Sequence, residues 1–152
     1  MERALFLDRD GVVNVEIDYA YLPAQITFMP GIFELCRRAH AAGEKIIIVT
    51  NQSGIGRGFY SEADFHALMA WMKEKFTEEG APLTAYYFCP HLPEDGCACR
   101  KPKPGMIVQA AKDWNIDLGN SRLLGDKQSD IEAGTAAGII DCCLVEGRLP
   151  LE

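Results

Sequence analysis

The stretch KIIIVT, Lys45 to Thr50, decides the fold. Three isoleucines and a valine form an unbroken apolar run, without the alternation of a strand that has one wet face. Such a run predicts a strand covered on both faces, which is typical of a parallel sheet with helices on either side. The polar segment TNQSG, residues 50–54, marks the carboxyl end of this strand.

The segments around this run alternate between strand and helix patterns. Further strands are predicted at residues 4–7, 85–89, 122–125 and 139–145. Helices are predicted at residues 31–43, 62–80, 103–114 and 129–138. Ser61 and Asp64 are expected to form a capping box where the second helix begins. This order predicts one α/β domain over residues 1–152, a doubly wound, Rossmann-like domain with a parallel five-stranded sheet flanked by helices and no large cap domain.

Composition and charge limit the function classes. The chain is 48% apolar and 24% charged, which is typical of a folded globular protein. It has no apolar run of the ~20 residues that span a bilayer and no signal-peptide pattern, so we expect a cytoplasmic protein without membrane contact. The net charge of -7 argues against nucleic-acid binding, because phosphate backbones require clustered cations. We expect a monomer that binds a small phosphorylated molecule.

Polar residues follow four of the predicted strands. In parallel α/β sheets, ligands bind at the carboxyl ends of the strands. These ends are followed by DRDG at residues 8–11, by TNQSG at 50–54, by a Cys/His loop that leads into Arg100 and Lys101, and by GDKQSD at 125–130. Their convergence on one edge of the sheet predicts a single site.

The residue types at this edge suit phosphoryl transfer. Asp8 and Asp126 offer the hard oxygen ligands that Mg²⁺ prefers. Lys101 and the Thr50 hydroxyl would stabilise the phosphoryl oxygens. Asp8 could attack phosphorus to form an acyl phosphate. Asp10 could protonate the leaving group and then accept a proton from the hydrolytic water.

Other features allow a structural interpretation or exclude other activities. Asp130 fits equally well as a helix cap and as part of the site. The glycine spacing of GIGRG, residues 54–58, does not match a dinucleotide-binding fingerprint. The sequence has neither a G-x-x-x-x-G-K-[ST] motif nor a G-x-S-x-G elbow, which argues against ATPases of that class and against ester hydrolases.

A zinc site is predicted in the loop at residues 89–99. Cys89, His91, Cys97 and Cys99 form two short pairs that match a tetrahedral set of three thiolates and one imidazole. Four protein ligands leave no position open for water, so the zinc is expected to be structural. The alternative is that two of the thiols are incidental and His91 is a surface histidine.

The position of this loop suggests its purpose. Arg100 and Lys101 follow its last predicted ligand directly, so a bound zinc would fix these cations near the strand ends. Cys36, Cys142 and Cys143 are expected to be small buried residues without a ligand role.

The motifs resemble those of a known superfamily. FLDRDG, VTNQSG, RKPKPG and GDKQSD are similar, in this order, to the four motifs of haloacid-dehalogenase-type (HAD) phosphatases. Within that superfamily, TNQSGIGRG, CRKPKPGM and GDK resemble the D-glycero-D-manno-heptose 1,7-bisphosphate 7-phosphatases, which act in the pathway to the lipopolysaccharide core. The resemblance extends from residue 5 to about residue 145.

This resemblance implies a role for each matching residue. Asp8 would be the nucleophile and a Mg²⁺ ligand, Asp10 the general acid/base with its backbone carbonyl on the metal, and Asp126 a third ligand. Thr50, Arg100 and Lys101 would stabilise the phosphoryl group. The implied substrate contacts are Glu16, Tyr19, Asn51, Gln52, Ser53, Arg100 and Lys127.

Three alternatives compete with a heptose phosphatase. CPHLPEDGCACRKPK, residues 89–103, resembles the loop of histidinol-phosphate phosphatases equally well, although NQSGIGRG and GDK favour the heptose substrate. A polynucleotide 3′-phosphatase shares the core motifs, but the acidic charge argues against it. A non-catalytic, zinc-stabilised interaction module would not need Asp8, Asp10, Lys101 and Asp126 together.

Overall fold

The computed structural model describes residues 1–151, so that only Glu152 of the predicted domain lies outside the described residues. Within them the sheet has five parallel strands in the order β3-β2-β1-β4-β5. The strands are β1 (Arg3–Leu7), β2 (Glu44–Asn51), β3 (Ala85–Cys89), β4 (Arg122–Gly125) and β5 (Asp141–Leu144). The α-helices are α1 (Ile32–Ala41), α2 (Ser53–Gly56), α3 (Glu62–Glu78), α4 (Gly105–Trp114) and α5 (Gln128–Ala137). The predicted fold class is confirmed.

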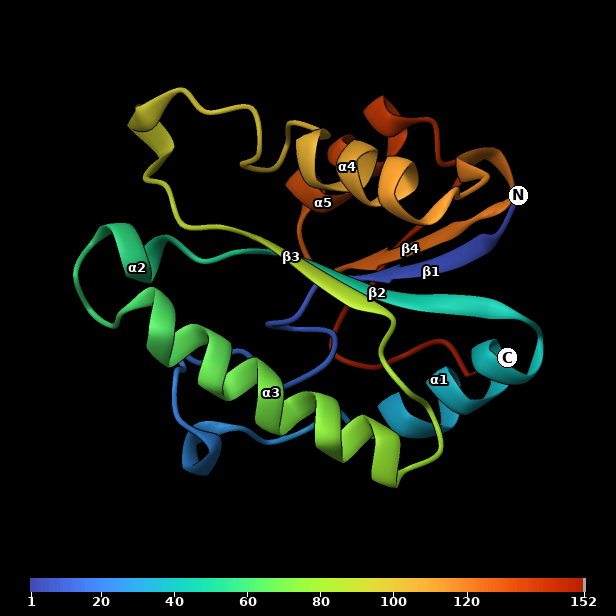
Figure 1. The fold of residues 1–152 in the computed structure, drawn as a ribbon, viewed down its shortest axis with the longest axis horizontal. Coiled ribbons are helices and arrows are strands. Elements are labelled where there is room, and N and C mark those ends of the chain that lie inside the picture. The colour runs from blue at the N-terminus through green and yellow to red at the C-terminus, as the bar shows by residue number, and fades with distance from the viewer. Residues whose placement is uncertain (152) are drawn as a thin grey trace.

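The sheet is the middle of three layers (Figure 1). α1 and α3 cover one face, and α4 and α5 cover the other. Along β2 the side chains alternate between the two cores: Ile46 and Ile48 face α1 and α3, whereas Ile47 and Val49 face α4. The uninterrupted apolar run therefore reflects burial on both faces, as predicted.

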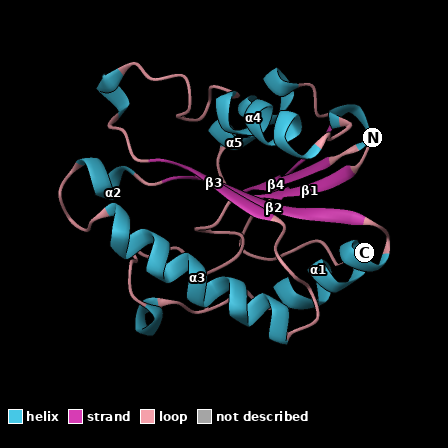
Figure 2. Ribbon diagram, in the orientation of Figure 1, coloured by secondary structure: helices cyan, strands magenta, loops and turns pink. Residues whose placement is uncertain are grey.

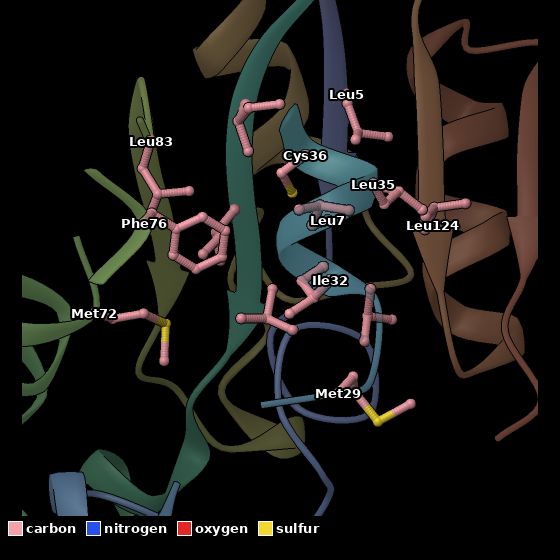
Figure 3. Close-up of a cluster of buried hydrophobic side chains, with 14 of the residues drawn as sticks. Leu5, Leu7, Met29, Ile32, Leu35, Cys36, Met72, Phe76, Leu83 and Leu124 are labelled. Atoms are coloured by element: carbon pink, nitrogen blue, oxygen red, sulfur yellow. The ribbon is translucent and has the colours of Figure 1, made fainter. Parts of the chain in front are cut away.

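Figure 3 shows the core beneath α1 and α3. Leu5 and Leu7 of β1 pack there with Ile32 of α1 and Phe76 of α3, and none of these side chains is more than 1% exposed. Full burial of such a side chain stabilises the fold by about 1.5–3 kcal/mol. This core fixes β1, and with it the position of the residues that follow β1.

The local signals for helix starts and strand burial are largely confirmed. Asp64 N donates to Ser61 Oγ and Ser61 N donates to the Asp64 carboxylate, each at 3.0 Å, which is the predicted capping box. Cys36 is buried as expected. The prediction that Cys142 and Cys143 are buried is wrong, because β5 is an edge strand and leaves both side chains half-buried.

The connections at the carboxyl edge of the sheet carry no extra domain within residues 1–151. The connection after β1 contains only the 3-10 turn Pro23–Gln25, and the one after β2 contains α2, which was not predicted (Figure 2). Residues 90–104 extend beyond the end of β3, on the same side of the molecule as α2 (Figure 1). No helix of residues 1–151 is long and apolar enough to cross a membrane.

Candidate active site

An open cleft of about 520 Å³ lies at the carboxyl ends of the strands. Most of the predicted site residues line it. They are Asp8, Asp10, Glu16, Tyr19, Asn51, Gln52, Ser53, Arg100, Lys101 and Lys127. The topology thus gathers four separate segments at one edge, and the roles given to these residues in catalysis stay predictions.

Lys101 forms a buried ion-pair triad with two carboxylates. Its Nζ lies 2.9 Å from Asp8 Oδ1 and 2.5 Å from Asp130 Oδ1, and it also donates to Val49 O at 3.0 Å. Burial raises the pKa of Asp8 well above its ordinary value, against the opposing effect of the Lys101 charge. Burial alone would lower the pKa of Lys101, but Asp8 and Asp130 outweigh it and raise that pKa. Lys101 is therefore a fixed cation beside Asp8.

Three carboxylates converge at the cleft: Asp8 and Asp130 line it, and Asp126 lies next to them without being part of the lining. One oxygen each of Asp8, Asp126 and Asp130 lies within 4.8 Å of the others. Asp126 Oδ1 is buried and has no hydrogen-bond partner among the described residues. A Cβ on Gly11, whose φ is +94°, would lie 2.1 Å from Asp126 Oδ2, so this glycine leaves room for the carboxylate. Clustered carboxylates with an unpaired buried oxygen fit a divalent cation.

Asp130 serves both purposes that the sequence left open. It is the third residue of α5, and its Oδ2 accepts from Asp126 N and Lys127 N, each at 3.1 Å. Its other oxygen pairs with Lys101. Asp130 thus fixes the turn that carries Asp126 while it balances the charge of Lys101. A Cβ on Gly125 would lie 2.2 Å from Asp130 Cβ, which explains glycine at the end of β4.

Two predicted substrate contacts also hold catalytic candidates in place. Asn51 Oδ1 accepts from Lys101 N at 3.0 Å, and Asn51 Nδ2 donates to Lys101 O at 3.4 Å. Gln52 Nε2 donates to Asp10 Oδ2 at 3.1 Å and to Thr50 Oγ1 at 2.9 Å. Thr50 itself is only 1% exposed and lies beneath the lining of the cleft.

Residues 16–19, in the connection after β1, form another part of the cleft lining. Burial raises the pKa of Glu16, and the nearby Asp10 carboxylate adds to this effect. Tyr19 adopts the left-handed backbone conformation with φ 58°, which is uncommon for a residue with a side chain. Its ring packs edge-on against Phe59, with centroids 4.8 Å apart. This contact joins the two segments that border the cleft.

The four predicted zinc ligands also converge. Cys89 Sγ lies 3.5 Å from Cys97 Sγ and 2.7 Å from Cys99 Sγ, and His91 Nδ1 lies 3.2 Å from Cys99 Sγ. All four donor atoms lie within 4.8 Å of one another. Three thiols and an imidazole around one point fit a tetrahedral metal site.

The Cys/His loop is connected to the cleft on two sides. Gly56 N of α2 donates to Pro90 O at 3.0 Å, and Arg100 Nη1 donates to His91 O at 3.5 Å. Lys103 Nζ donates to Cys97 O at 2.7 Å. The loop therefore supports both Arg100 and the segment that carries Arg57.

Several residues of the site were not predicted from the sequence. Arg57, Tyr60 and Ser129 line the cleft, and Tyr60 OH donates to Gln52 Oε1 at 2.5 Å. Arg9 lies beneath the cleft and pairs with Asp10. The Arg of DRDG was a visible signal, because it lies inside a segment already assigned to the site. Arg57 lies in TNQSGIGRG, a motif that resembles the heptose phosphatases, just beyond the segment assigned to the site.

Comparison with known proteins identifies the family. The chain is 53% identical over 153 residues to the D-glycero-alpha-D-manno-heptose-1,7-bisphosphate 7-phosphatase of Burkholderia mallei, covering 96% of this chain and 81% of the relative. The chain belongs to the heptose 1,7-bisphosphate 7-phosphatase family. The D-glycero-beta-D-manno-heptose-1,7-bisphosphate 7-phosphatase of Helicobacter pylori is 48% identical to this chain. The alignment covers 90% of this chain and 80% of that relative.

Solved structures agree with this family membership. The D,D-heptose 1,7-bisphosphate phosphatase of B. bronchiseptica, complexed with magnesium and phosphate, superposes with a TM-score of 0.85 at 36% identity, covering 90% of this chain and 77% of that one. A model of the HAD-hydrolase-like family matches residues 98–147. The chain is therefore a phosphatase of the HAD superfamily.

Proposed function

We propose that this phosphatase removes the 7-phosphate of D-glycero-D-manno-heptose 1,7-bisphosphate through an aspartyl-phosphate intermediate on Asp8. The observation that carries the proposal is the buried contact between Asp8 and Lys101, beside the carboxylate of Asp126. It joins a nucleophile, a cation for the phosphoryl oxygens and a metal-binding carboxylate at one point. The names of the relatives support the substrate.

The carboxylate cluster at the cleft would hold Mg²⁺ through Asp8, Asp126 and the backbone carbonyl of Asp10. When bound, Mg²⁺ supplies the positive charge that lets a carboxylate approach a phosphate dianion. Lys101 provides a second, permanent positive charge against the phosphoryl oxygens. The solved relative complexed with magnesium and phosphate supports magnesium as the metal.

Two carboxylates of this chain, Asp8 and Asp10, carry out the bond-making and proton-transfer steps. The ionised Asp8 attacks phosphorus, the bond from phosphorus to the sugar oxygen breaks, and a protonated Asp10 donates its proton to that oxygen. Asp10 next removes a proton from water, whose oxygen attacks phosphorus. Inorganic phosphate leaves, Asp8 is restored as a carboxylate, and Asp10 is protonated again.

The rest of the cleft would select the sugar. Its volume of about 520 Å³ suits a small ligand. Arg100 and Lys127 offer positive charge at the lining, and Glu16, Tyr19, Asn51 and Ser53 offer polar contacts. Gln52 contributes mainly through Asp10 and Thr50, to which it already donates.

We also propose a structural zinc ion on Cys89, His91, Cys97 and Cys99. The convergence of their donor atoms supports it. We further propose that the protein works as a monomer in the cytoplasm. None of its six cysteines forms a disulfide, which suits that reducing compartment. Zinc content by elemental analysis and mass by light scattering test these two points.

A histidinol-phosphate phosphatase is the second candidate, because its loop sequence resembles residues 89–103. The test is to compare kcat/KM for phosphate release from both anomers of heptose 1,7-bisphosphate and from histidinol phosphate. We expect at least one anomer to be preferred over histidinol phosphate by more than about tenfold, which corresponds to about 1.4 kcal/mol of transition-state binding. Equal or faster release from histidinol phosphate would overturn the proposed substrate.

A further inference from the structure

Arg9, between the two aspartates of DRDG, is buried beneath the cleft. It is only 1% exposed, and it is the largest fully buried side chain among the described residues. A guanidinium is costly to bury unless its charge and its N–H groups are satisfied. Asp8 and Asp10 line the cleft, whereas Arg9 does not. Because Arg9 does not line the cleft, any role it has must come from its contacts with neighbouring residues.

The main partner of Arg9 is the neighbouring carboxylate of Asp10. Arg9 Nη2 lies 3.1 Å from Asp10 Oδ1 and 3.3 Å from Oδ2, and Nε lies 3.3 Å from Oδ1. A planar guanidinium that bonds both oxygens fixes the rotation of a carboxylate as well as its position. Asn14 Nδ2 donates to Oδ1 at 3.0 Å and Gln52 Nε2 donates to Oδ2 at 3.1 Å, but each of these reaches one oxygen only.

The remaining contacts of Arg9 anchor it on two sides. Nη2 also donates to Ala20 O at 3.1 Å, in the segment whose Glu16 and Tyr19 line the cleft. Nη1 lies 3.9 Å from Met69 Sδ, and the guanidinium carbon lies 5.8 Å from the ring centroid of Phe65, both in α3. Arg9 thus connects the rigid core, the Asp10 carboxylate and one wall of the cleft.

We propose that Arg9 is a positioning residue that holds the Asp10 carboxyl group in the orientation needed to protonate the leaving oxygen. This inference rests on the proposed role of Asp10 as general acid. This ion pair differs from one that only stabilises the fold, because Asp10 lines the cleft whereas Arg9 does not. Arg9 can therefore orient the Asp10 carboxyl group without contacting the substrate. Its loss should therefore impair proton donation more than phosphoryl attack.

The dependence of the rate on the leaving group separates positioning from a purely structural role. A sugar alkoxide needs a proton to leave, whereas 2,4-dinitrophenolate leaves without one. The value of kcat/KM reports the steps up to the transfer of phosphorus to Asp8, so it includes protonation of the leaving group but not the later hydrolysis. Arg9→Gln and wild type are compared on heptose 1,7-bisphosphate and on 2,4-dinitrophenyl phosphate.

We expect Arg9→Gln to lose at least about tenfold more kcat/KM on the sugar phosphate than on the aryl phosphate, a part of the roughly 10²–10⁴-fold that general acid catalysis supplies. Asp10→Asn should show the same selectivity, and the double variant should lose no more than Asp10→Asn alone. Arg9→Lys, which keeps the buried charge, should show a smaller selective loss because an ammonium cannot bond both oxygens in one plane. Equal losses on both substrates, or none, would overturn the proposal.

Met69→Leu is the matched control. It removes the sulfur contact of Arg9 on α3 and leaves the contacts between Arg9 and Asp10 intact, so the ratio of kcat/KM between the two substrates should not change.

Arg9→Lys also covers the case in which Arg9→Gln does not fold. Wild-type release of phosphate from the heptose bisphosphate tests the proposed substrate separately. If only another alkyl phosphate is hydrolysed, the same ratio measured with that compound still decides the role of Arg9, and a wild type without phosphatase activity overturns both proposals.

Discussion

Lys101 Nζ lies 2.9 Å from Asp8 Oδ1, although the two residues are 93 positions apart in the sequence. Both side chains are almost completely buried. In the proposed mechanism, the pair places a cation where negative charge accumulates during attack on phosphorus. It also balances two carboxylates, because Asp130 contacts the same ammonium group.

Lys101→Met tests both consequences of this contact. The variant leaves Asp8 and Asp130 buried without a cation, so the free energy of unfolding should fall by about 3 kcal/mol, the lower end for one missing partner of a buried pair. The value of kcat should fall by at least about 10², since a fixed charge at the phosphoryl group is lost. Urea unfolding and steady-state kinetics measure the two effects.

The double variant Lys101→Met/Asp8→Asn is the control for the stability effect. It removes one of the two unpaired carboxylates, so it should recover part of the lost stability but none of the activity. A double variant as unstable as the sum of the two single variants would contradict the charge-balance argument.

Gly11→Ala should weaken the metal site. The added methyl group would lie 2.1 Å from Asp126 Oδ2 and would force this carboxylate away from Asp8. Gly138→Ala is the matched control, because Gly138 also has a positive φ, +106°, but nothing lies within 4 Å of a Cβ there. Both variants should lose about 1 kcal/mol of stability from backbone strain. Only Gly11→Ala should weaken Mg²⁺ binding in calorimetry, and equal Mg²⁺ binding by the two variants would contradict this account.

Removal of zinc should loosen the loop at residues 89–99 and the cations that follow it. We expect one zinc ion per chain in wild type, and we expect Cys97→Ser to lose the metal and melt at a lower temperature. Its KM should also rise, because Arg100 is held by the His91 carbonyl. Cys143→Ser, in β5, is the matched control and should keep its zinc. A Cys97→Ser variant with wild-type metal content would exclude the site.

Tyr60 should make stability depend on pH in the alkaline range. Burial raises the pKa of its hydroxyl from 10.0 to about 12. The unfolded chain therefore loses this proton first, so the contribution of Tyr60 is complete below pH 10.0 and declines as the pH rises towards about 12. The free energy of unfolding of wild type should exceed that of Tyr60→Phe by about 1–3 kcal/mol at pH 8, because Gln52 Oε1 loses its donor.

This difference between wild type and Tyr60→Phe should become smaller at pH 11. Urea unfolding of both proteins at pH 8, 10 and 11 measures it. A difference that stays constant or grows over this range would show that the hydroxyl is not protected in the folded state.

The strand–helix order and the ends of the strands could be predicted from the sequence. The run from Lys45 to Thr50 indicates burial on both faces, and parallel strands bring their carboxyl ends together whatever their distance along the chain. For this reason Asp8 and Lys101 could be placed at one site before any contact was known. The capping box at Ser61 could be predicted as well, because it depends on neighbouring residues only.

Contacts that depend on side-chain direction could not be predicted. α2 has four residues, two of them glycine, which is too short to show a helical period. The sequence DRDG does not reveal that Arg9 turns away from the cleft and bonds Asp10, since this depends on the space left between β1 and α3. The half-buried state of Cys142 follows from the place of β5 at the sheet edge, and strand order is not contained in the apolar pattern.

The most direct test of the account is to trap the intermediate on Asp8. The enzyme is mixed with Mg²⁺ and heptose 1,7-bisphosphate and quenched with borohydride, which reduces an acyl phosphate to the alcohol, and the peptides are analysed by mass spectrometry. We expect homoserine at position 8 in wild type and no modification in Asp8→Asn. Rapid phosphate release with an unmodified Asp8, or trapping at a different carboxylate, would contradict it.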